Sequence, residues 1–230
     1  MLEKLPGVVG HALRDRRAGL DKVLFNRFDL RSGTGSIRVT SLAFADHAPI
    51  PVGYTADGDG VSPPLEWSGI PAGAGSVLLV VEDADSPTPQ PLVHAIVTGL
   101  PPQDGGLGAG AIDRGRITDS EDGGGPEATV GRNSFLDTGW LPPDPPPGHG
   151  PHRYVFQVFA LADSGRSDLQ PGPAPGREAV SRLIAEHAVA SGILVGVYER
   201  PDGTVKAGDA ERARAEATVS PAGPDGLAGG

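Results

Sequence analysis

The chain has 230 residues, a formal net charge of −10 and a pI of about 5.0, and it contains no cysteine. Without cysteine it can form neither a disulfide nor a cysteine-ligated zinc site. An acidic surface repels the phosphates of nucleic acids and of anionic membranes, so we expect neither as the main partner. The 35 glycines and 24 prolines disfavour long helices, because glycine costs entropy in a helix interior and proline removes a backbone donor.

The sequence contains no segment that approaches the roughly 20 apolar residues of a membrane-spanning helix. Its first residues also lack the uninterrupted apolar stretch of a signal peptide. Together with the lack of cysteine, these features predict a cytoplasmic protein without integral membrane contact.

We interpret residues 1–36 as an N-terminal helical extension, with a short helix that opens near Pro6. The apolar side of this helix is narrow, so we expect it to pack on the domain or on a second copy of the chain. The second arrangement would make the protein a homodimer. A basic helix that lies on a membrane surface is the alternative.

Short apolar runs between turn signals predict strands across residues 37–200, which we interpret as one domain. The expected strands are Ile37–Phe44, Ser76–Glu82, His94–Thr98, Tyr154–Leu161 and Leu194–Tyr198. The second run is continuous and apolar, which is typical of a strand that is buried on both faces. Short strands with frequent turns predict a mainly β sandwich with a few peripheral helices.

The C-terminal part of the chain combines one helix with a polar tail. Apolar residues at helical spacing predict a helix over Gly176–Ser191, and we expect Gly192 to end it. Residues 201–230 are polar and rich in glycine and alanine. We predict a disordered tail there, because such a segment buries too little surface to offset the entropy of ordering.

Two carboxylates follow the second predicted strand. Asp83 and Asp85 are two residues apart, so both lie on one side if the chain stays extended, and Pro87 biases the residue before it away from helix. Carboxylates at a strand end can orient a histidine by accepting a hydrogen bond from one ring nitrogen. His94 opens the next predicted strand. An acidic turn and a structural histidine are the alternatives at these positions.

A proline-rich loop, Asp144–Pro151, leads into the strand predicted at Tyr154. Proline fixes φ and reduces the entropy lost on ordering, so such a loop can hold the rim of a pocket. The loop delivers His149, His152 and Arg153 to the start of the strand, and these donors suit an anion. A polyproline linker or an adaptor-binding motif is the alternative.

Other patterns do not support a cofactor, and we predict none. Gly106–Ala111 imitates a dinucleotide fingerprint but follows a turn instead of a strand. Asp57–Gly60 is similar to the start of a calcium loop, but Ser68 stands where the bidentate glutamate should be. We also predict no metal, with a site built from His94, His152 and an aspartate as the alternative.

Together these stretches resemble the phosphatidylethanolamine-binding family, in its bacterial Raf-kinase-inhibitor-like branch. The resemblance covers about Ser41 to Arg200 and rests on five stretches in the order that the family has them. They are Asp57–Pro71 with its Ser-Pro-Pro-Leu-Glu-Trp run, Asp83–Pro87, His94, Gly131–Phe156 with its Pro-Pro-Pro-Gly-His-Gly-Pro-His run, and Gly196–Tyr198.

The resemblance implies a Greek-key β-sandwich with a pocket for phosphate or a phospholipid head group. Carried over by position, the ligand-binding residues would be Asp83, Asp85, Pro87, His94, Asp144, Pro145, His152 and Tyr154. We expect the carboxylates to accept hydrogen bonds from protein groups instead of contacting an anion. The chain departs from the family pattern at Ala84, Val93, Leu141–Pro142 and Asp144. The last of these adds an acid to the rim, which would weaken anion binding.

Three functions follow from this resemblance. The preferred one is non-catalytic binding of a small anionic or phosphorylated ligand, and we assign no catalytic residue. The second is regulation of a kinase or a protease through exposed loops such as Gly105–Pro126. The third is a phospho-ester hydrolase or isomerase that uses His94 and Asp83 as acid and base.

Overall fold

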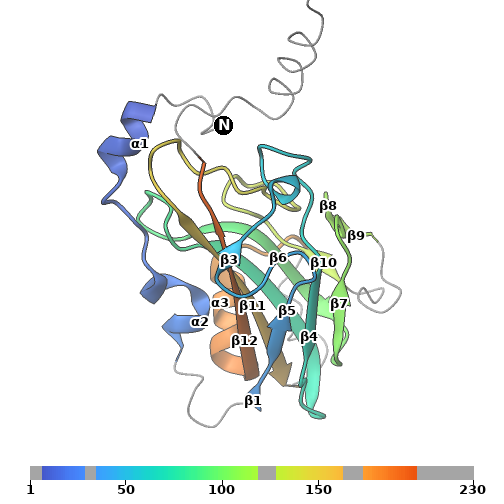
Figure 1. The fold of residues 1–230 in the computed structure, drawn as a ribbon. Helices are drawn as coiled ribbons and strands as arrows, with labels where there is room; N and C mark the ends of the chain where they lie inside the picture. Colours follow the sequence, from blue (N-terminus) through green and yellow to red (C-terminus); the bar gives the residue numbers. More distant parts are fainter. Residues whose placement is uncertain (1–6, 29–34, 119–127, 163–172, 201–230) are drawn as a thin grey trace, which may run out of the picture.

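The computed structural model describes residues 7–28, 35–118, 128–162 and 173–200, which form a mainly β structure (Figure 1). Four long antiparallel strands make the centre of the larger sheet, in the order β6 (Leu92–Leu100), β5 (Ala74–Asp83), β11 (His152–Ala162) and β12 (Ala188–Tyr198). At its margins β10 (Thr129–Val130) pairs with β6, while β1 (Gly35–Ser36) and β3 (Ala48–Pro49) pair in parallel with β12.

A smaller sheet and several short elements complete the domain. The smaller sheet has the order β2 (Arg38–Thr40), β4 (Leu65–Ser68) and β7 (Gly105–Leu107). A hairpin joins β8 (Ile112–Asp113) to β9 (Arg116–Ile117). The helices are α1 (Gly7–Leu13), η2 (Leu20–Lys22), α2 (Leu24–Arg27), η3 (Val52–Tyr54) and α3 (Arg177–His187).

The larger sheet is buried on both faces. One face packs against the smaller sheet through side chains such as Trp67, Val81 and Phe156. The other face packs against α2 and α3 through side chains such as Leu24 and Ile184, and Figure 1 shows α3 behind the sheet. Residues 77–81 have no exposed surface, which confirms the prediction of a strand buried on both faces.

The structure corrects two of the predicted elements. The strand expected over Ile37–Phe44 ends at Thr40, because the Ser41 hydroxyl accepts a hydrogen bond from the backbone N–H of Ala43 and the chain bends there. The helix expected over Gly176–Ser191 ends at His187, and the following residues begin β12. A short apolar run fits both a helix and a buried strand, so periodicity alone could not separate them.

Gly192 therefore lies inside a strand and does not end a helix. A Cβ atom at this position would lie 2.0 Å from the carbonyl oxygen of Ile37. The glycine lets the chain before β2 cross close to β12.

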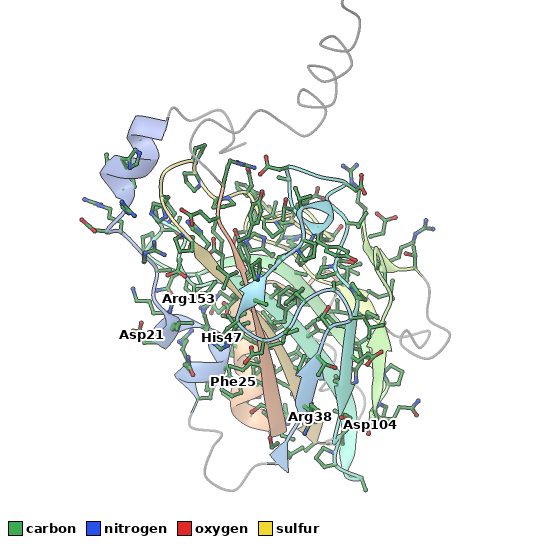
Figure 2. The ribbon with its side chains drawn as sticks, in the orientation of Figure 1. Asp21, Phe25, Arg38, His47, Asp104 and Arg153 are labelled. Atoms are coloured by element: carbon green, nitrogen blue, oxygen red, sulfur yellow. The ribbon has the colours of Figure 1, made fainter. Side chains whose placement is uncertain are left out.

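The described part of the N-terminal extension packs against the domain. The backbone N–H groups of Ala18 and Gly19 donate to the carbonyl oxygens of Ser86 and Ala84, at 2.9 and 2.8 Å. Figure 2 shows Asp21 and Phe25 of this segment beside the larger sheet. The predicted tail at 201–230 lies outside the described residues, as do parts of the extension and of the Gly105–Pro126 region.

In the described ranges, no helix has both the length and the apolar character needed to cross a membrane.

A buried ion pair ties α3 and the N-terminal segment to the sheet. Glu82 is fully buried, and its Oε1 accepts a hydrogen bond from Nε of Arg177 at 2.6 Å. Its Oε2 accepts hydrogen bonds from the backbone N–H of Leu24 and from Nε2 of Gln157, at 2.8 and 2.9 Å. Arg177 in turn donates to the carbonyl oxygen of Lys22. Removing either charge would leave the other one buried without its partner.

We expect Arg177→Met to lower the free energy of unfolding by about 3 kcal/mol, because it leaves the carboxylate of Glu82 buried and uncompensated. Urea unfolding checks this value. Arg182→Met is the matched control on the same helix, since Arg182 pairs with Glu178 and its side chain is 70% exposed against 19% for Arg177. The control should change stability by less than about 0.5 kcal/mol. Equal effects of the two variants would contradict this account.

Candidate functional site

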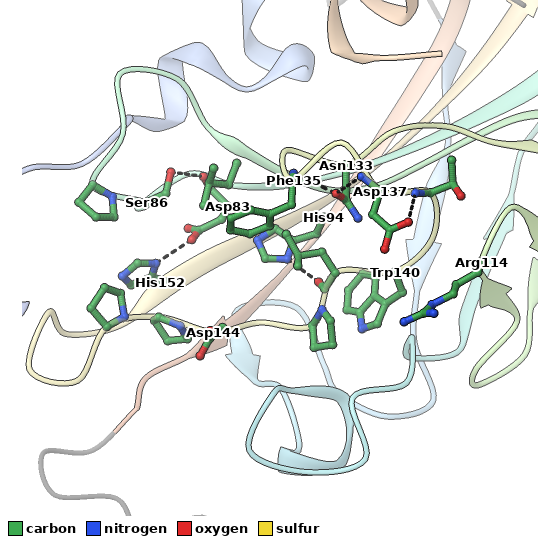
Figure 3. Close-up of a pocket in the computed structure, with 17 residues that line it drawn as sticks. Asp83, Ser86, His94, Arg114, Asn133, Phe135, Asp137, Trp140, Asp144 and His152 are labelled. Atoms are coloured by element: carbon green, nitrogen blue, oxygen red, sulfur yellow. Dashed lines mark hydrogen bonds and ion pairs between the residues drawn. The ribbon is translucent and has the colours of Figure 1, made fainter. Parts of the chain in front are cut away.

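A cavity of about 460 Å³ lies where β5 ends and where β6 and β11 begin (Figure 3). Six of the eight predicted site residues line it, namely Asp83, Pro87, His94, Asp144, Pro145 and His152. The other two, Asp85 and Tyr154, are buried but are not among the lining residues. The sequence therefore brings most of the predicted side chains together at one end of the larger sheet.

A β-bulge brings His94 to the cavity. Val81 pairs with Ala95 and Glu82 pairs with Val93, so His94 is an extra residue of β6 without an opposite partner on β5. Such bulges re-aim a side chain relative to the regular alternation of a strand. The His94 ring contacts Tyr154, with ring centroids 5.1 Å apart.

The hydrogen bonds of His94 fix which of its nitrogens is free. Nδ1 lies 2.6 Å from the carbonyl oxygen of Leu141, which can only accept, so Nδ1 carries a proton. Nε2 is buried and has no partner among the described residues. Burial lowers the pKa of His94, and the nearby Asp83 opposes this shift. The neutral ring therefore presents an unshared electron pair at Nε2.

The contact with Leu141 uses backbone atoms in both directions. The backbone N–H of Leu141 donates to the carbonyl oxygen of His94 at 2.8 Å, and the carbonyl oxygen of Leu141 accepts from the His94 ring. Leu141 thus holds His94 through two hydrogen bonds, although Leu141–Pro142 is one of the places where the chain departs from the family pattern.

Asp83 holds His152 at the wall of the cavity. Its Oδ2 lies 2.8 Å from Nδ1 of His152, and its Oδ1 accepts a hydrogen bond from the backbone N–H of Asp85 at 2.8 Å. This second bond closes a tight turn directly after the strand. Asp83 thus accepts hydrogen bonds from protein groups, as we expected of the carboxylates, although it also lines the cavity.

The same turn sends Asp85 away from the cavity. Its carboxylate accepts hydrogen bonds from Nε and NH2 of Arg153, at 2.7 and 2.6 Å, and pairs with Arg17 at 2.9 Å. The assumption of an extended chain, which placed both aspartates on one side, is therefore wrong. Burial disfavours the ionised form of Asp85, but the hydrogen bonds from Arg153 and Arg17 outweigh burial and lower its pKa to about 2.

Asp144 pairs with an arginine that the sequence analysis did not find. Arg200 is buried, and its guanidinium bonds to Asp144 and to Asp57, the second at 2.7 Å. It also donates to the carbonyl oxygen of Pro145 at 3.2 Å. The extra acid at the rim thus has a cationic partner, which it shares with Asp57.

Tyr154 packs behind the cavity wall. Its ring lies against those of His94 and His152, with centroids 5.1 and 6.4 Å away. Its hydroxyl is buried and has no partner among the described residues. Burial raises the pKa of Tyr154, and the charge of Asp83 adds to this shift, so the phenol keeps its proton.

Arg114 supplies a positive charge that sequence reasoning missed. It lies in the turn between β8 and β9 and is the one lysine or arginine among the residues that line this cavity. In the described ranges its guanidinium forms no ion pair. Its backbone lies against Gly139, where a Cβ atom would come within 3.4 Å of the Arg114 Cα. An exposed arginine in a turn carries no sequence signal of such a role.

No metal site is formed by the part of the chain that the structure describes: no group of three or more histidine, aspartate or glutamate side chains is placed to hold an ion.

A family model described as phosphatidylethanolamine-binding protein matches residues 40–199. The chain belongs to this family. A relative from Methanothermobacter thermautotrophicus, named UPF0098 protein, is 35% identical over 158 residues, which are 69% of this chain and 95% of the relative. LppC of Mycobacterium tuberculosis, whose name calls it a lipoprotein, is 37% identical over 163 residues, which are 71% of this chain and 72% of LppC. The cytoplasmic location thus stays a prediction.

Solved structures of the family confirm the predicted fold. The crystal structure of Escherichia coli YbcL matches with a TM-score of 0.62 and 27% identity, over 71% of this chain and 98% of YbcL. The homologue CT736 of Chlamydia trachomatis matches with a TM-score of 0.60 and 34% identity, over 74% of this chain and 99% of CT736. The family match begins at residue 40, so the N-terminal segment lies outside it.

The low pKa of Asp85 predicts a stability that depends on pH. A carboxyl whose folded pKa of about 2 lies below its usual value of 3.8 stabilises the fold above pH 3.8, and this contribution is lost as the pH falls toward 2. We expect Asp85→Asn to remove about 2 kcal/mol of stability near pH 7 and progressively less below pH 4. Urea unfolding at a series of pH values measures how the stability of the wild type and of the variant depends on pH. Asp59→Asn is the control, because Asp59 is exposed. If the stability of Asp85→Asn depended on pH as steeply as that of the wild type, the prediction would be contradicted.

Proposed function

We propose that this protein binds a small phosphate-containing ligand, either a phosphorylated molecule or a phospholipid head group, in the cavity beside His94. The observation that carries the proposal is the unpartnered Nε2 of His94, a buried polar atom on a residue that lines the cavity. A buried polar atom without a hydrogen bond is costly, and a ligand that pairs with it removes this cost. The volume of about 460 Å³ suits a small ligand.

One basic side chain in the cavity wall is available to an anion. His152 faces the carboxylate of Asp83, and Asp144 shares Arg200 with Asp57. Arg114 forms no ion pair in the described ranges and brings a positive charge to the wall, where Asp137 brings a negative one. A guanidinium is well suited to phosphate oxygens, because it presents several donors in one plane.

The neutral His94 sets a further requirement on the ligand. Its Nε2 accepts a hydrogen bond, so the ligand must offer a donor there as well as anionic oxygens elsewhere. A monohydrogen phosphate has one hydroxyl donor, and phosphoethanolamine adds an ammonium group. Either ligand satisfies both demands.

Apolar side chains line the rest of the cavity. They include Pro87, Leu92, Phe135 and Trp140, and the Phe135 side chain is half exposed. These side chains would contact the carbon atoms of an ester, so we expect phosphoethanolamine to bind more tightly than inorganic phosphate. Affinity should still be weak, since either ligand has few atoms to contribute.

Calorimetric titration tests the site. We expect saturable binding of phosphate and phosphoethanolamine to the wild type, and at least a roughly tenfold weaker affinity in His94→Ala, because the acceptor that we assign to the ligand donor is lost. His47→Ala is the control, since His47 is exposed and does not line the cavity. Absence of binding in the wild type, or equal binding in His94→Ala, would refute the proposal.

A second titration tests the charge at the wall. Arg114→Gln should weaken phosphate binding by about threefold at low salt, with a smaller effect at high salt, because exposed charges are screened. Arg116→Gln is the matched control on the same hairpin: Arg116 is exposed, lies 4.0 Å from Asp113 and does not line the cavity. Equal losses in both variants would show a general effect of net charge and contradict a role of Arg114 in the cavity.

A further inference from the structure

We infer that His149 is a positioning residue for the cavity: by anchoring its own ring to the N-terminal segment, it keeps an extra proton on His152, beside the carboxylate of Asp83. This inference deepens the proposed function and rests on it, because the charge of Asp83 matters to an anion bound in the cavity. His149 does not line the cavity and acts through His152.

A buried chain of hydrogen bonds connects the cavity to the N-terminal segment. Oδ2 of Asp83 lies 2.8 Å from Nδ1 of His152, and Nε2 of His152 lies 2.7 Å from Nδ1 of His149. Nε2 of His149 faces the carbonyl oxygens of Leu13 and Arg16, at 2.8 and 3.2 Å. The three side chains are almost inaccessible to solvent.

The number of protons on this chain follows from its end points. Carbonyl oxygens can only accept, so Nε2 of His149 must carry a proton. One more proton must lie between the two rings, and a third between His152 and Asp83, because two unprotonated atoms at hydrogen-bond distance would repel each other. Two neutral imidazoles and a carboxylate hold two protons in total. Asp83, His152 and His149 together therefore hold one extra proton and have no net charge.

The extra proton lies on His152, the histidine of the pair that meets the cavity. Burial lowers the pKa of His149, and the neighbouring His152 lowers it further. His152 lies beside the carboxylate of Asp83, whereas His149 faces two carbonyl oxygens, so His149 is the neutral member, with its free electron pair at Nδ1. His152 donates from Nε2 to that electron pair and from Nδ1 to Asp83, as an imidazolium beside a carboxylate.

Nearby charged groups do not replace this proton. The titratable and charged side chains that surround the three residues are His94, Tyr154, Asp144, Asp85, Arg17 and Arg153. Both arginines pair with Asp85, and Asp144 pairs with Arg200. The negative charge of Asp83 is thus offset by the proton on His152, so an anion meets no net charge at this part of the wall.

The N-terminal segment is placed precisely enough to provide the anchor. A Cβ atom at Gly10 would lie 1.9 Å from the carbonyl oxygen of Pro147, so α1 packs in direct contact with the proline-rich loop. Arg17 donates to the carbonyl oxygens of His149 and Pro151, at 3.2 and 2.8 Å. This segment lies outside the match to the family model, so the anchor is a feature of this chain's extension.

Nitrogen NMR of the ligand-free, full-length protein with 15N-labelled histidine counts the protons directly. At about pH 8, where ordinary imidazoles have lost the extra proton, we expect two nitrogen-bound protons on His152 and one on His149. His149→Phe removes the acceptor, so His152 should fall to one proton. His149→Asn places an amide oxygen near the position of Nδ1 and should restore the second proton.

Phosphate titration connects the proton to binding. The ratio of the affinities of wild type and His149→Phe should be about ten at pH 8, because Asp83 in the variant carries an uncompensated charge beside the anion. The ratio should fall toward one as the pH is lowered, because protons from the solvent then replace the one that the variant has lost. A ratio removes the effect of the ligand's own titration. A merely structural loss would give a ratio that does not change with pH.

Gly10→Ala tests the segment without a change to the histidines. We expect it to displace α1 and to leave one nitrogen-bound proton on His152, as His149→Phe does. Gly73→Ala is the control, because a Cβ atom there would meet no atom within 4 Å. One proton on wild-type His152 at pH 8 overturns the inference whether or not phosphate binds. A wild type with the three expected protons that binds no phosphate supports the proton assignment and refutes the proposed function instead.

Discussion

Three carboxylates leave the end of β5 within four residues, and all three are buried. An ionised carboxylate without a partner is expensive in such a place, so each one needs a positive group of its own. The partners are Arg177 for Glu82, His152 for Asp83, and Arg153 together with Arg17 for Asp85. Because these partners come from α3, β11 and the N-terminal segment, the end of one strand ties distant parts of the chain together. Positions in each of these elements are constrained by the same need to neutralise charge.

This pairing decides what the cavity can recognise. Three aspartates line it: Asp83 pairs with His152, Asp144 pairs with Arg200, and Asp137 is exposed. A fourth, Asp85, is turned away toward Arg153. Recognition then depends on few groups, because most of the lining is apolar or already hydrogen bonded. The free Nε2 of His94 and the guanidinium of Arg114 are the polar groups that we assign to a ligand. A cavity built in this way selects through the geometry of a donor and an anion more than through total charge.

The sequence predicted the parts that local patterns encode. The long apolar strands were located because their residues are apolar over a continuous run, and the helix was extended too far because Ala188–Ser191 fits both periods. The family motifs located six residues of the cavity. The direction of Asp85 depends on a turn that its own backbone N–H closes, which a spacing of two residues does not reveal. Arg200 pairs with Asp144 across 56 residues, and no local pattern marks such a pair.

The connection between the extension and the cavity was hidden for a different reason. His149 was visible in the loop, but its partners are the backbone carbonyl oxygens of Leu13 and Arg16, and any residue type provides these. Side-chain changes at those two positions should therefore leave the anchor in place. The positions that matter are Gly10, where no side chain fits, and Arg17, whose charge holds the segment on Asp85. The extension acts on the cavity through the placement of its backbone, so its effect depends on how it is docked and not on a recognisable motif.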